Sequence, residues 1–397
     1  MKILFVIPSI TNYFTFLEDL VDKLIDSGHV VSLATSTRHI SDINCYKRDL
    51  RCQLFNIEFP RGFSPLKHFQ AAQKLNQVVQ TTQPNLVNVH FSAAVFTAAL
   101  AKRKNWPTCI GTFHGLSFPI VGGWQKIVIG LAEKWSASRM DTSFVLTEDD
   151  REILEKFLNN GTARTFRSYG LGCNLNTFDK STIDESAARR LKEKLQIKEN
   201  DFVFIFIGRQ VHFKGFDKIV KAFMQLYNTN SNFKLMLVGA RDHIHSNNLT
   251  PAEEKAMNEC PGFIPVGWQE NVNEYLNIAD VNIFPSIREG LPVNLMESLA
   301  MGVPVITINS RGCRDIVIDK IDGIVLDENS VEALSSAMLN LYNNREELNR
   351  YARNALRARF RFDRKNFIEE QFEIYEELTG LPARITRDDK VHSSELS

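Results

Sequence analysis

Short apolar runs alternate with helix-periodic segments along most of the chain, and this alternation limits the fold more than any other feature. In the first half, the runs that resemble strands contain no Asp, Glu, Lys or Arg: residues 3–7, 30–35, 86–90, 108–113 and 143–147. Segments with helical spacing of apolar residues lie between them, at 14–27, 93–103, 124–138 and 148–158. Strands that are apolar throughout are typical of a parallel sheet covered by helices on both faces. The first half is therefore predicted to be a doubly wound α/β unit.

The second half repeats the same alternation. Expected strands are residues 202–207, 233–238, 281–284, 305–308 and 323–326, with expected helices at 216–227, 293–301 and 331–342 and a turn-rich stretch at 239–280. A length of 397 residues, 44% of them hydrophobic, suits two globular domains rather than one. Two such Rossmann-like domains, facing each other across a cleft, would bind ligands at the carboxyl ends of both sheets.

The domain boundary is placed near residues 170 to 180, just before a polar, charged stretch at 181–200. We expect a first domain at 1–172, a second at 173–362, and a helix at 363–380 that packs back on the first domain. Residues 381–397 are polar and lack periodicity, which predicts a disordered tail. Candidate functional residues are then expected in the loops that follow the strands.

Two glutamates, Glu289 and Glu297, lie on either side of a predicted helix start marked by Gly290 and Pro292. Free amides at a helix start, together with the helix dipole, suit an anion. Two carboxylates beside that anion site indicate a ligand with hydroxyls around a phosphate, such as a sugar nucleotide. The alternative is that Asn294, Glu297 and Ser298 form only the solvated polar stripe of an amphipathic helix.

The turn after the strand 202–207 reads Gly208-Arg209-Gln210-Val211-His212-Phe213-Lys214-Gly215. Gly208 allows a ligand to approach the backbone, and Arg209 and Lys214 bring two cations to one turn, which suits a diphosphate. Alternatively, Arg209 pairs with a structural carboxylate and Lys214 is a solvated residue at a helix start. Spacing alone leaves both interpretations open.

His114 follows the strand 108–113 and precedes the flexible Gly115. From the carboxyl end of a strand, an imidazole can contact a bound ligand. A single histidine beside an apolar run is also commonly structural, so this alternative stays open.

Other chemistries lack their signatures. The sequence has no Asp-x-Asp triplet, no His-x-x-x-His pair and no cysteine cluster, and a metal role for His243 and His245 has little support, so no metal site is predicted. Neutralising a diphosphate then depends on Arg209, Lys214 and backbone amides. A phosphate loop and a Gly-x-Gly-x-x-Gly after the first strand are both absent, which argues against a phosphate-loop ATPase and a nicotinamide dehydrogenase.

The charge is unevenly distributed although the chain is neutral overall. Residues 61–140 contain nine Lys and Arg against a single acid, Glu133. Such a segment indicates a polyanion or an anionic membrane surface. No nucleic-acid-binding motif accompanies it, so nucleic acid is not expected as a partner.

Several features predict a cytoplasmic protein. Six scattered cysteines suggest reduced thiols, and the apolar start MKILFVI is too short for a signal peptide. No apolar run reaches the roughly 18 to 20 residues of a spanning helix. We therefore expect a protein that is soluble or lies on a membrane without crossing it.

Together, REGLPVNLMESLAMGVPVI, GRQVHFKG and GTFHG resemble the retaining family 4 glycosyltransferases of the two-domain B-type fold (GT-B). The resemblance implies that Glu297 holds the ribose of the donor nucleotide and Glu289 contacts the donor sugar. It also implies that Arg209 and Lys214 bind the diphosphate. The amides of Gly290 and Leu291, the backbone at Gly208 and the side chain of His114 complete the implied site. A nucleotide-diphosphate sugar, most simply a UDP-sugar, is the implied donor, with no further cofactor.

A longer stretch, GTFHGLSFPIVGGWQKIVIGLAEKW, looks like bacterial enzymes that build capsule, exopolysaccharide or O-antigen units on a polyprenyl-diphosphate lipid. This implies a lipid-linked saccharide acceptor and a peripheral location at the inner face of the cytoplasmic membrane. The interfacial aromatic residues would be Trp106, Phe118, Trp124 and Trp135.

The sequence departs from the family at one loop. Ser9-Ile10-Thr11-Asn12 replaces a Gly-Gly pair that many members carry near the acceptor, so acceptor contacts do not transfer. Two other functions remain possible: a nucleotide-sugar 2-epimerase of similar fold, and a non-catalytic protein that binds sugars or nucleotides.

Overall fold

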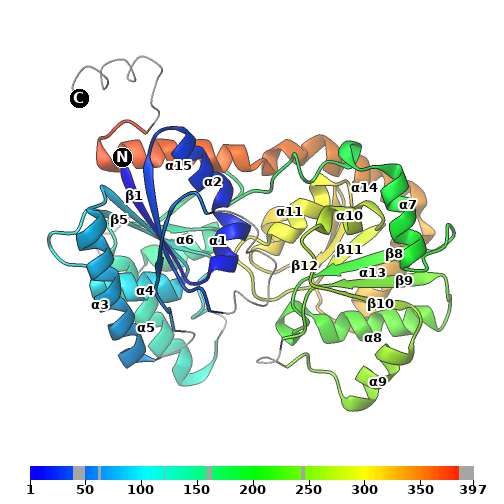
Figure 1. Cartoon of the computed structure of the whole chain (residues 1–397). Coiled ribbons are helices and arrows are strands. Elements are labelled where there is room, and N and C mark those ends of the chain that lie inside the picture. Colours follow the sequence, from blue (N-terminus) through cyan, green and yellow to red (C-terminus); the bar gives the residue numbers. More distant parts are fainter. Residues whose placement is uncertain are drawn as a thin grey trace. The chain divides into compact units, whose positions relative to one another are not determined.

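The computed structural model describes residues 1–38, 50–60, 64–119, 121–156, 158, 163–242 and 246–383. By its internal contacts the chain divides into two compact units (Figure 1). Unit 1 comprises Met1–Gly170 and Lys365–Ser397, and unit 2 comprises Leu171–Arg364. Most of the expected tail, from residue 384 onward, lies outside the described residues.

Unit 1 contains a parallel sheet in the order β3-β2-β1-β4-β5-β6-β7. Its strands are β1 (Lys2–Ile7), β2 (Val30–Thr35), β3 (Gln53–Asn56), β4 (Leu86–His90), β5 (Thr108–Phe113), β6 (Thr142–Val145) and β7 (Ala163–Thr165). The chain adds β2 and β3 on one side of β1 and β4 to β7 on the other, so the order reverses between β1 and β4. In open α/β sheets, ligands bind at the carboxyl ends of the strands beside such a reversal.

Helices cover both faces of this sheet. They are α1 (Ile10–Phe16), α2 (Glu18–Asp26), α3 (Pro65–Thr82), α4 (Ser92–Ala101), α5 (Gly123–Arg139), α6 (Glu148–Glu155) and the C-terminal α15 (Arg364–Thr379). Strand residues such as Val87 and Val89 share one core with α3, α4 and α5. Asn88, between them, faces the other side because strand side chains alternate, and its amide donates to the buried Tyr375 hydroxyl of α15 at 2.6 Å. The C-terminal helix therefore packs on unit 1, on the face opposite α3, α4 and α5.

Unit 2 has a second parallel sheet, in the order β10-β9-β8-β11-β12-β13. Its strands are β8 (Phe202–Ile207), β9 (Phe233–Val238), β10 (Phe263–Gly267), β11 (Val281–Phe284), β12 (Val305–Ile308) and β13 (Gly323–Leu326). Its α-helices are α7 (Glu185–Lys194), α8 (Phe216–Tyr227), α9 (Pro251–Glu259), α10 (Val272–Asn277), α11 (Val293–Ala300), α12 (Cys313–Ile316), α13 (Val331–Asn343) and α14 (Arg345–Ala358). Three short 3₁₀ helices are η3 (Lys180–Thr182), η4 (His212–Lys214) and η5 (Arg359–Phe362). The strand order reverses between β8 and β11, so the predicted pair of doubly wound α/β domains is confirmed.

The structure contains elements that the sequence pattern did not predict. The expected helix at 14–27 is two helices, α1 and α2, which meet at Leu17. Helix α3 was not predicted because alanines supply part of its buried face. Strand β10 contains Pro265, which cannot donate to a ladder; the strand is at the edge of the sheet, where that loss is tolerated.

Candidate functional site

An ion pair between Lys214 and Glu289 lies where the strand order of unit 2 reverses. Lys214 ends η4, after β8, and Glu289 lies in the loop after β11, 75 residues further along the chain. Both side chains are sheltered, with 16% and 11% of their surface exposed. The ammonium group is also 5.0 Å from the centre of the Phe284 ring. The two motifs singled out in the sequence therefore meet at one point.

Gly215 makes this meeting possible. Its φ of +75° is left-handed, and a Cβ there would lie 2.5 Å from Cγ and 2.7 Å from the carbonyl oxygen of Pro285. Only glycine accommodates both the conformation and the contact. The two loops are then joined by hydrogen bonds to the Phe213 carbonyl, from the Ile287 amide at 2.9 Å and the Ser286 hydroxyl at 3.1 Å.

The loop that carries Glu289 is held from several sides. The Ser286 hydroxyl lies 2.5 Å from Oε1 of Glu289, and Nε of Arg311 donates to the Glu289 carbonyl at 3.3 Å. A Cβ on Gly312 would lie 2.0 Å from the Gly290 carbonyl oxygen, so the loop after β12 supports the Glu289 loop closely. Sequence analysis missed Ser286; its position directly after the β11 strand was the available signal.

Two backbone amides beside this pair are free. Within the described ranges, neither Gly290 N–H nor Leu291 N–H has a hydrogen-bond partner. Helix α11 begins just after them at Val293, and its N-cap, Pro292, makes no side-chain capping bond. Free amides at a helix start attract anions. The site thus combines a cation, a carboxylate and unpaired donors.

The solvated-stripe alternative for α11 is wrong. The Asn294 amide donates to the Ile207 carbonyl at 2.9 Å, and Ser298 is buried and accepts a hydrogen bond from Asn282 at 2.7 Å. Both side chains are therefore directed into the protein, where they attach α11 to the sheet.

Glu297 differs from these neighbours because, among the described residues, its carboxyl group has no hydrogen-bond donor. It lies on the second turn of α11 and is half-buried. Burial raises its pKa to about 7, an effect that the Arg364 guanidinium partly offsets. An unpartnered carboxyl of this kind is available to accept hydrogen bonds from ligand hydroxyls.

Arg209 is placed differently from Lys214. Its side chain is 53% exposed, and its guanidinium contacts Asp242 at 2.5 Å, in the loop after β9. The guanidinium also lies 5.6 Å from the Phe213 ring centre. The adjacent Gly208 donates its amide to the Val238 carbonyl, which holds the loops after β8 and β9 together. Arg209 is thus paired with a carboxylate, as one of the two sequence interpretations expects.

In unit 1, His114 directly follows β5, and its Nε2 lies 3.0 Å from Nδ1 of His90, the last residue of β4. The His114 ring stacks on Phe91 at a centroid distance of 3.9 Å and an interplanar angle of 8°. Burial lowers the pKa of His90 to about 3 and that of His114 well below its ordinary value. Both imidazoles are therefore neutral at physiological pH. Sequence analysis missed His90, whose position at a strand end was the same signal that identified His114.

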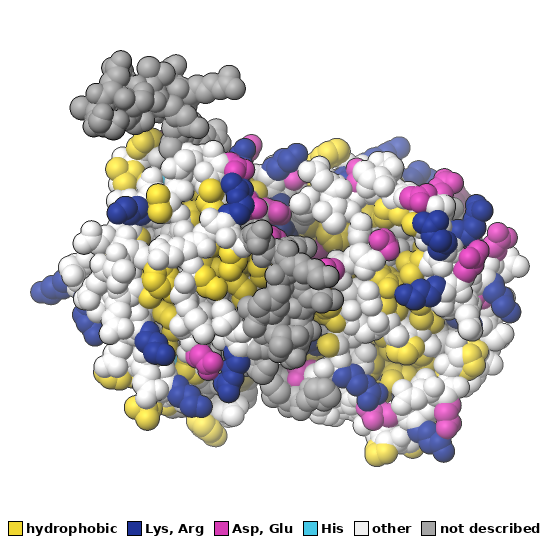
Figure 2. All heavy atoms as spheres, viewed as in Figure 1, with side chains coloured by type: hydrophobic (Ala, Val, Ile, Leu, Met, Phe, Trp, Pro, Cys, Tyr) yellow, Lys and Arg dark blue, Asp and Glu magenta, His cyan; other side chains and the backbone are white. Residues whose placement is uncertain are grey.

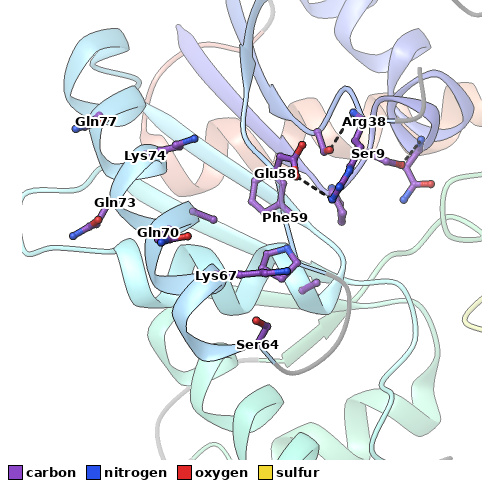
Figure 3. Close-up of a pocket in the computed structure, with 16 residues that line it drawn as sticks. Ser9, Arg38, Glu58, Phe59, Ser64, Lys67, Gln70, Gln73, Lys74 and Gln77 are labelled. Atoms are coloured by element: carbon purple, nitrogen blue, oxygen red, sulfur yellow. Dashed lines mark hydrogen bonds and ion pairs between the residues drawn. The ribbon is translucent and has the colours of Figure 1, made fainter. Parts of the chain in front are cut away.

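Unit 1 also contains a pocket of about 1050 Å³ beside α3 (Figure 3). Lys67, Gln70 and Lys74 point from α3 toward Glu58 and Phe59, which follow β3 (Figure 3). Ser9, which caps α1, and Asn12, in the first turn of α1, also line the pocket, and both belong to the segment that departs from the family pattern. Within the described ranges neither lysine has an ion-pair partner, so the α3 side of the pocket is positively charged.

Two of the four aromatic residues predicted to be interfacial are not. Phe118 is only 8% exposed and belongs to the core beneath α4 and α5. Trp106 packs against the same core and donates its indole N–H to Asn76 at 2.9 Å. Trp124 and Trp135, in contrast, are 70% and 41% exposed.

The described residues contain no group of three or more His, Cys, Asp or Glu arranged to hold a metal ion, and His243 and His245 lie outside them. No described helix combines the length and apolar character needed to span a bilayer.

Two doubly wound units, each with its polar residues at the strand ends, define the fold of the B-type glycosyltransferases. A solved structure with this fold is Anabaena Alr3699/HepE in complex with UDP and glucose, which aligns with a TM-score of 0.75 over 96% of this chain and 100% of that one. Its sequence identity is 16%, so the likeness concerns the fold alone.

Sequence families identify the class more closely. Residues 188–358 match the Glycosyl transferases group 1 family, and residues 15–166 match the Glycosyl transferase 4-like domain. The chain is therefore a glycosyltransferase, with a group 1 domain in its second half and a 4-like domain in its first, and the resemblance inferred from its motifs is confirmed.

Curated relatives agree with this assignment. The putative glycosyltransferase EpsD of Bacillus subtilis is 25% identical over 81% of this chain and 84% of its own length. The Escherichia coli UDP-Gal:alpha-D-GlcNAc-diphosphoundecaprenol alpha-1,3-galactosyltransferase is 25% identical over 70% of this chain and 72% of its own.

Proposed function

We propose that this glycosyltransferase moves a sugar, with retention of anomeric configuration, from a UDP-sugar to a saccharide carried on a polyprenyl diphosphate. Surface polysaccharide assembly, as for capsule or lipopolysaccharide, is the corresponding process. The observation that carries the proposal is the sheltered Lys214–Glu289 pair beside the amides of Gly290 and Leu291, which have no hydrogen-bond partner among the residues that the structure describes. The name of the E. coli relative, which specifies a UDP-sugar and a diphosphoundecaprenol acceptor, supports both substrates.

The donor diphosphate replaces two protein carboxylates as the partner of Lys214 and Arg209. In the structure, Lys214 is paired with Glu289, and Arg209 with Asp242. A bound diphosphate takes over both cations and receives the Gly290 and Leu291 amides, with the Gly208 backbone close by. Glu289 is then released to accept hydrogen bonds from the donor sugar. Glu297, whose carboxyl group has no hydrogen-bond donor among the described residues, accepts hydrogen bonds from the ribose hydroxyls.

The transfer step needs no protein nucleophile. The bond between the anomeric carbon and the diphosphate breaks, and its electron pair stays on the diphosphate, which Lys214, Arg209 and the amides stabilise. The acceptor hydroxyl attacks from the same face, and its proton passes to an oxygen of the departing diphosphate. His114 is assigned a hydrogen bond to the reacting sugar, made by a neutral imidazole because its pKa is lowered by burial.

Unit 1 supplies the features expected for the acceptor. The pocket beside α3 carries Lys67 and Lys74, which suit the acceptor's diphosphate. An acceptor held in a lipid bilayer places the enzyme peripherally at the inner, anionic face of the cytoplasmic membrane.

Donor binding is tested with UDP by thermal shift and calorimetry. Arg209→Ala should weaken UDP binding about tenfold, since a charge-assisted contact contributes roughly 1.5 kcal/mol. Arg350→Ala is the matched control, because Arg350 is also about half exposed and ion-paired, with Glu347. Equal UDP affinity in the parent and Arg209→Ala would remove Arg209 from the diphosphate site.

Turnover is tested by incubating the protein with UDP-sugars, with and without a bacterial lipid extract. Transfer requires the extract, whereas a 2-epimerase converts the donor alone and a binding protein converts nothing. NMR of the product then reports the anomeric configuration. An inverted product would exclude the retaining mechanism.

A further inference from the structure

Helix α5 has an inverted amphipathic pattern. Trp124, Ile127, Leu131 and Trp135 follow helical spacing on one face, and they are 70%, 65%, 63% and 41% exposed. The buried residues of α5 are instead small or polar: Gly130, Glu133, Ser136 and Ala137. A helix that packs only on its own domain shows the opposite arrangement. A large exposed apolar stripe indicates a binding surface.

Helix α3 extends this apolar surface. Leu66 and Phe69 on α3 are 69% and 51% exposed. Phe96 of α4 connects the two helices, since its ring lies 5.0 Å from that of His68 on α3 and 5.7 Å from that of Trp135 on α5. Figure 2 shows hydrophobic and basic side chains together along the lower edge of unit 1, over α3 and α5. We call the exposed apolar residues of α3 and α5 the α3/α5 face.

The exposed charges on these two helices are all positive. Helix α3 carries Lys67 and Lys74 and no acid, and α5 carries Lys126, Lys134 and Arg139. The single acid of α5, Glu133, is 4% exposed and accepts hydrogen bonds from the Ser117 amide and the Ser92 hydroxyl. An anionic surface can therefore approach without meeting an exposed carboxylate on either helix.

We propose that the α3/α5 face docks on an anionic lipid bilayer. Tryptophans at both ends of the stripe suit the interface between headgroups and acyl chains, and flanking lysines reach the anionic headgroups. The stripe runs about 16 Å along α5, from the helical rise over its length. Docking here brings α3, whose Lys67 and Lys74 line the pocket of unit 1, to the lipid surface. This inference rests on the proposed function for its biological meaning, because a lipid-linked acceptor is reached only at a membrane.

The test measures binding of the full chain to sedimenting vesicles of phosphatidylcholine with and without phosphatidylglycerol. The parent should bind the anionic vesicles, and its tryptophan emission should shift to the blue. The double variant Ile127→Glu, Leu131→Glu should lose about tenfold or more in partition, because it removes apolar area and adds repulsion. Both positions are exposed, so folding should be retained.

The matched control is Ile318→Glu, Ile321→Glu, which places the same charges on exposed isoleucines of unit 2 (46% and 47% exposed). The control should change partition by less than about twofold. The proposal is wrong if the parent does not bind anionic vesicles, or if the stripe variant binds them as strongly as the parent does. Transfer to a short-chain, water-soluble acceptor should be equal in the parent and the stripe variant. Vesicle binding and sugar transfer are thus measured separately, and either can fail alone.

A second inference comes from the histidine pair of unit 1. Both rings are neutral, so the contact between His90 Nδ1 and His114 Nε2 joins one N–H to one bare nitrogen. His90 is fully buried, and its Nε2 has no partner among the described residues. A buried N–H group without an acceptor costs more free energy than a buried unprotonated nitrogen without a donor. The proton of His90 is therefore on Nδ1, and His90 donates to His114.

The consequence for His114 is a fixed tautomer. Its Nε2 accepts from His90, so its own proton is on Nδ1, which has no partner within the described ranges. Phe91 stacks on the ring and fixes its plane, although Phe91 itself is held at a φ of +72°, a strained value for an aromatic residue. We infer that His90 is a positioning residue that makes His114 present an Nδ1–H donor to the sugar. The role assigned to that donor rests on the proposed function.

Two variants of His90 test this. His90→Asn keeps an N–H donor near the position of Nδ1, whereas His90→Phe keeps the ring and loses the donor. His90→Phe should lower kcat about tenfold or more with little change in KM for the donor, and His90→Asn should recover most of the loss. Equal kcat in His90→Phe and the parent contradicts the inference.

Nitrogen-15 NMR of histidine-labelled protein reads the tautomer without any activity. The parent should show His114 protonated at Nδ1, and His90→Phe should shift His114 toward the Nε2–H form. His114 protonated at Nε2 in the parent overturns the inference even if sugar transfer is confirmed. Failure of the proposed function would leave this tautomer unchanged.

Discussion

The two units have similar sheet topologies but differ in the charges at their strand ends. At the strand ends of unit 2, Lys214 and Glu289 form a sheltered ion pair next to two amides that have no partner in the described part of the chain. At the strand ends of unit 1, His90 and His114 form a neutral pair enclosed by Phe91 and Phe16. A site with charged side chains suits an ionic diphosphate, and an uncharged site suits sugar hydroxyls. The fold supplies the position, and the side chains at the strand ends supply the chemistry.

The largest expected effect comes from removing the charge of unit 2. Lys214→Ala should lower kcat about 10³-fold, because the departing diphosphate loses a cation in a sheltered site. It should also cost about 3 kcal/mol of stability, since Glu289 is left without its partner. Steady-state kinetics and urea unfolding measure the two effects. Lys221→Ala, which breaks the more exposed pair with Glu253, is the control and should leave kcat unchanged.

Removing the neutral site of unit 1 should have a smaller effect of a different kind. His114→Ala should lower kcat about 10²-fold and change UDP affinity less than twofold, because a hydrogen bond to the sugar is lost while the charged site is intact. Calorimetry with UDP and kinetics with the complete donor separate these outcomes. Between pH 6 and 8 the activity of the parent should show no titration of His114, because burial lowers the pKa of this imidazole well below its ordinary value. A UDP affinity that falls along with kcat would end the proposed distinction between the two units.

A comparison of Gly215 with Gly267 separates the effect of a steric clash in the unit 2 site from the cost of a left-handed backbone. Their φ values are +75° and +76°, but a Cβ at Gly267 meets nothing within 4 Å, whereas at Gly215 it meets Pro285. Gly267→Ala should cost about 1 kcal/mol from the backbone alone, and Gly215→Ala about 3 kcal/mol. Only Gly215→Ala should weaken UDP binding, because it separates the loops that join Lys214 to Glu289. Equal costs in unfolding experiments would show that the loops do not depend on this contact.

The smallest effect concerns Glu297, the other carboxyl of unit 2. Burial raises the pKa of Glu297 from 4.5 to about 7 in the folded chain. As the pH rises, the unfolded chain loses this proton before the folded chain does, so the parent loses stability between about pH 4.5 and pH 7. Glu297→Gln does not titrate. Between pH 4 and pH 8, the free energy of unfolding of Glu297→Gln should rise by about 1 to 3 kcal/mol relative to that of the parent. Thermal unfolding measured across this pH range tests the difference. The gain should be accompanied by weaker UDP binding. A pH-independent difference would show that burial does not perturb this carboxyl.

Much of unit 2 could be predicted from the sequence because its signals are local. Uninterrupted apolar strands, Gly208 and Gly215 in one turn, and Gly290 with Pro292 before a helix each have a short-range physical cause. These signals selected two loops that the structure brings together through Lys214 and Glu289. They did not indicate Ser286, because a serine after a strand is common and its role depends on where Glu289 points.

Prediction was weaker for unit 1, where helix α5 exposes large apolar residues and buries small or polar ones. The sequence suggested four interfacial aromatics, but Phe118 and Trp106 pack inside while Trp124 and Trp135 are exposed. Helical spacing shows that Trp124, Ile127 and Leu131 share a face, and it cannot show whether that face meets the core or the solvent. The small residues Gly130 and Ala137 face inward because α5 packs closely on α4 and the sheet.

The sequence by itself determined the alternation of strands and helices, the two-domain class and the loops that carry Glu289, Lys214 and His114. It could do so because hydrophobic periodicity and turn chemistry act over a few residues. Only the tertiary structure decided that Lys214 pairs with Glu289 across 75 residues, that His90 Nδ1 lies 3.0 Å from His114 Nε2, and that the apolar face of α5 points outward. Partners of this kind are set by which strands lie side by side, and strand order depends on the packing of the whole domain.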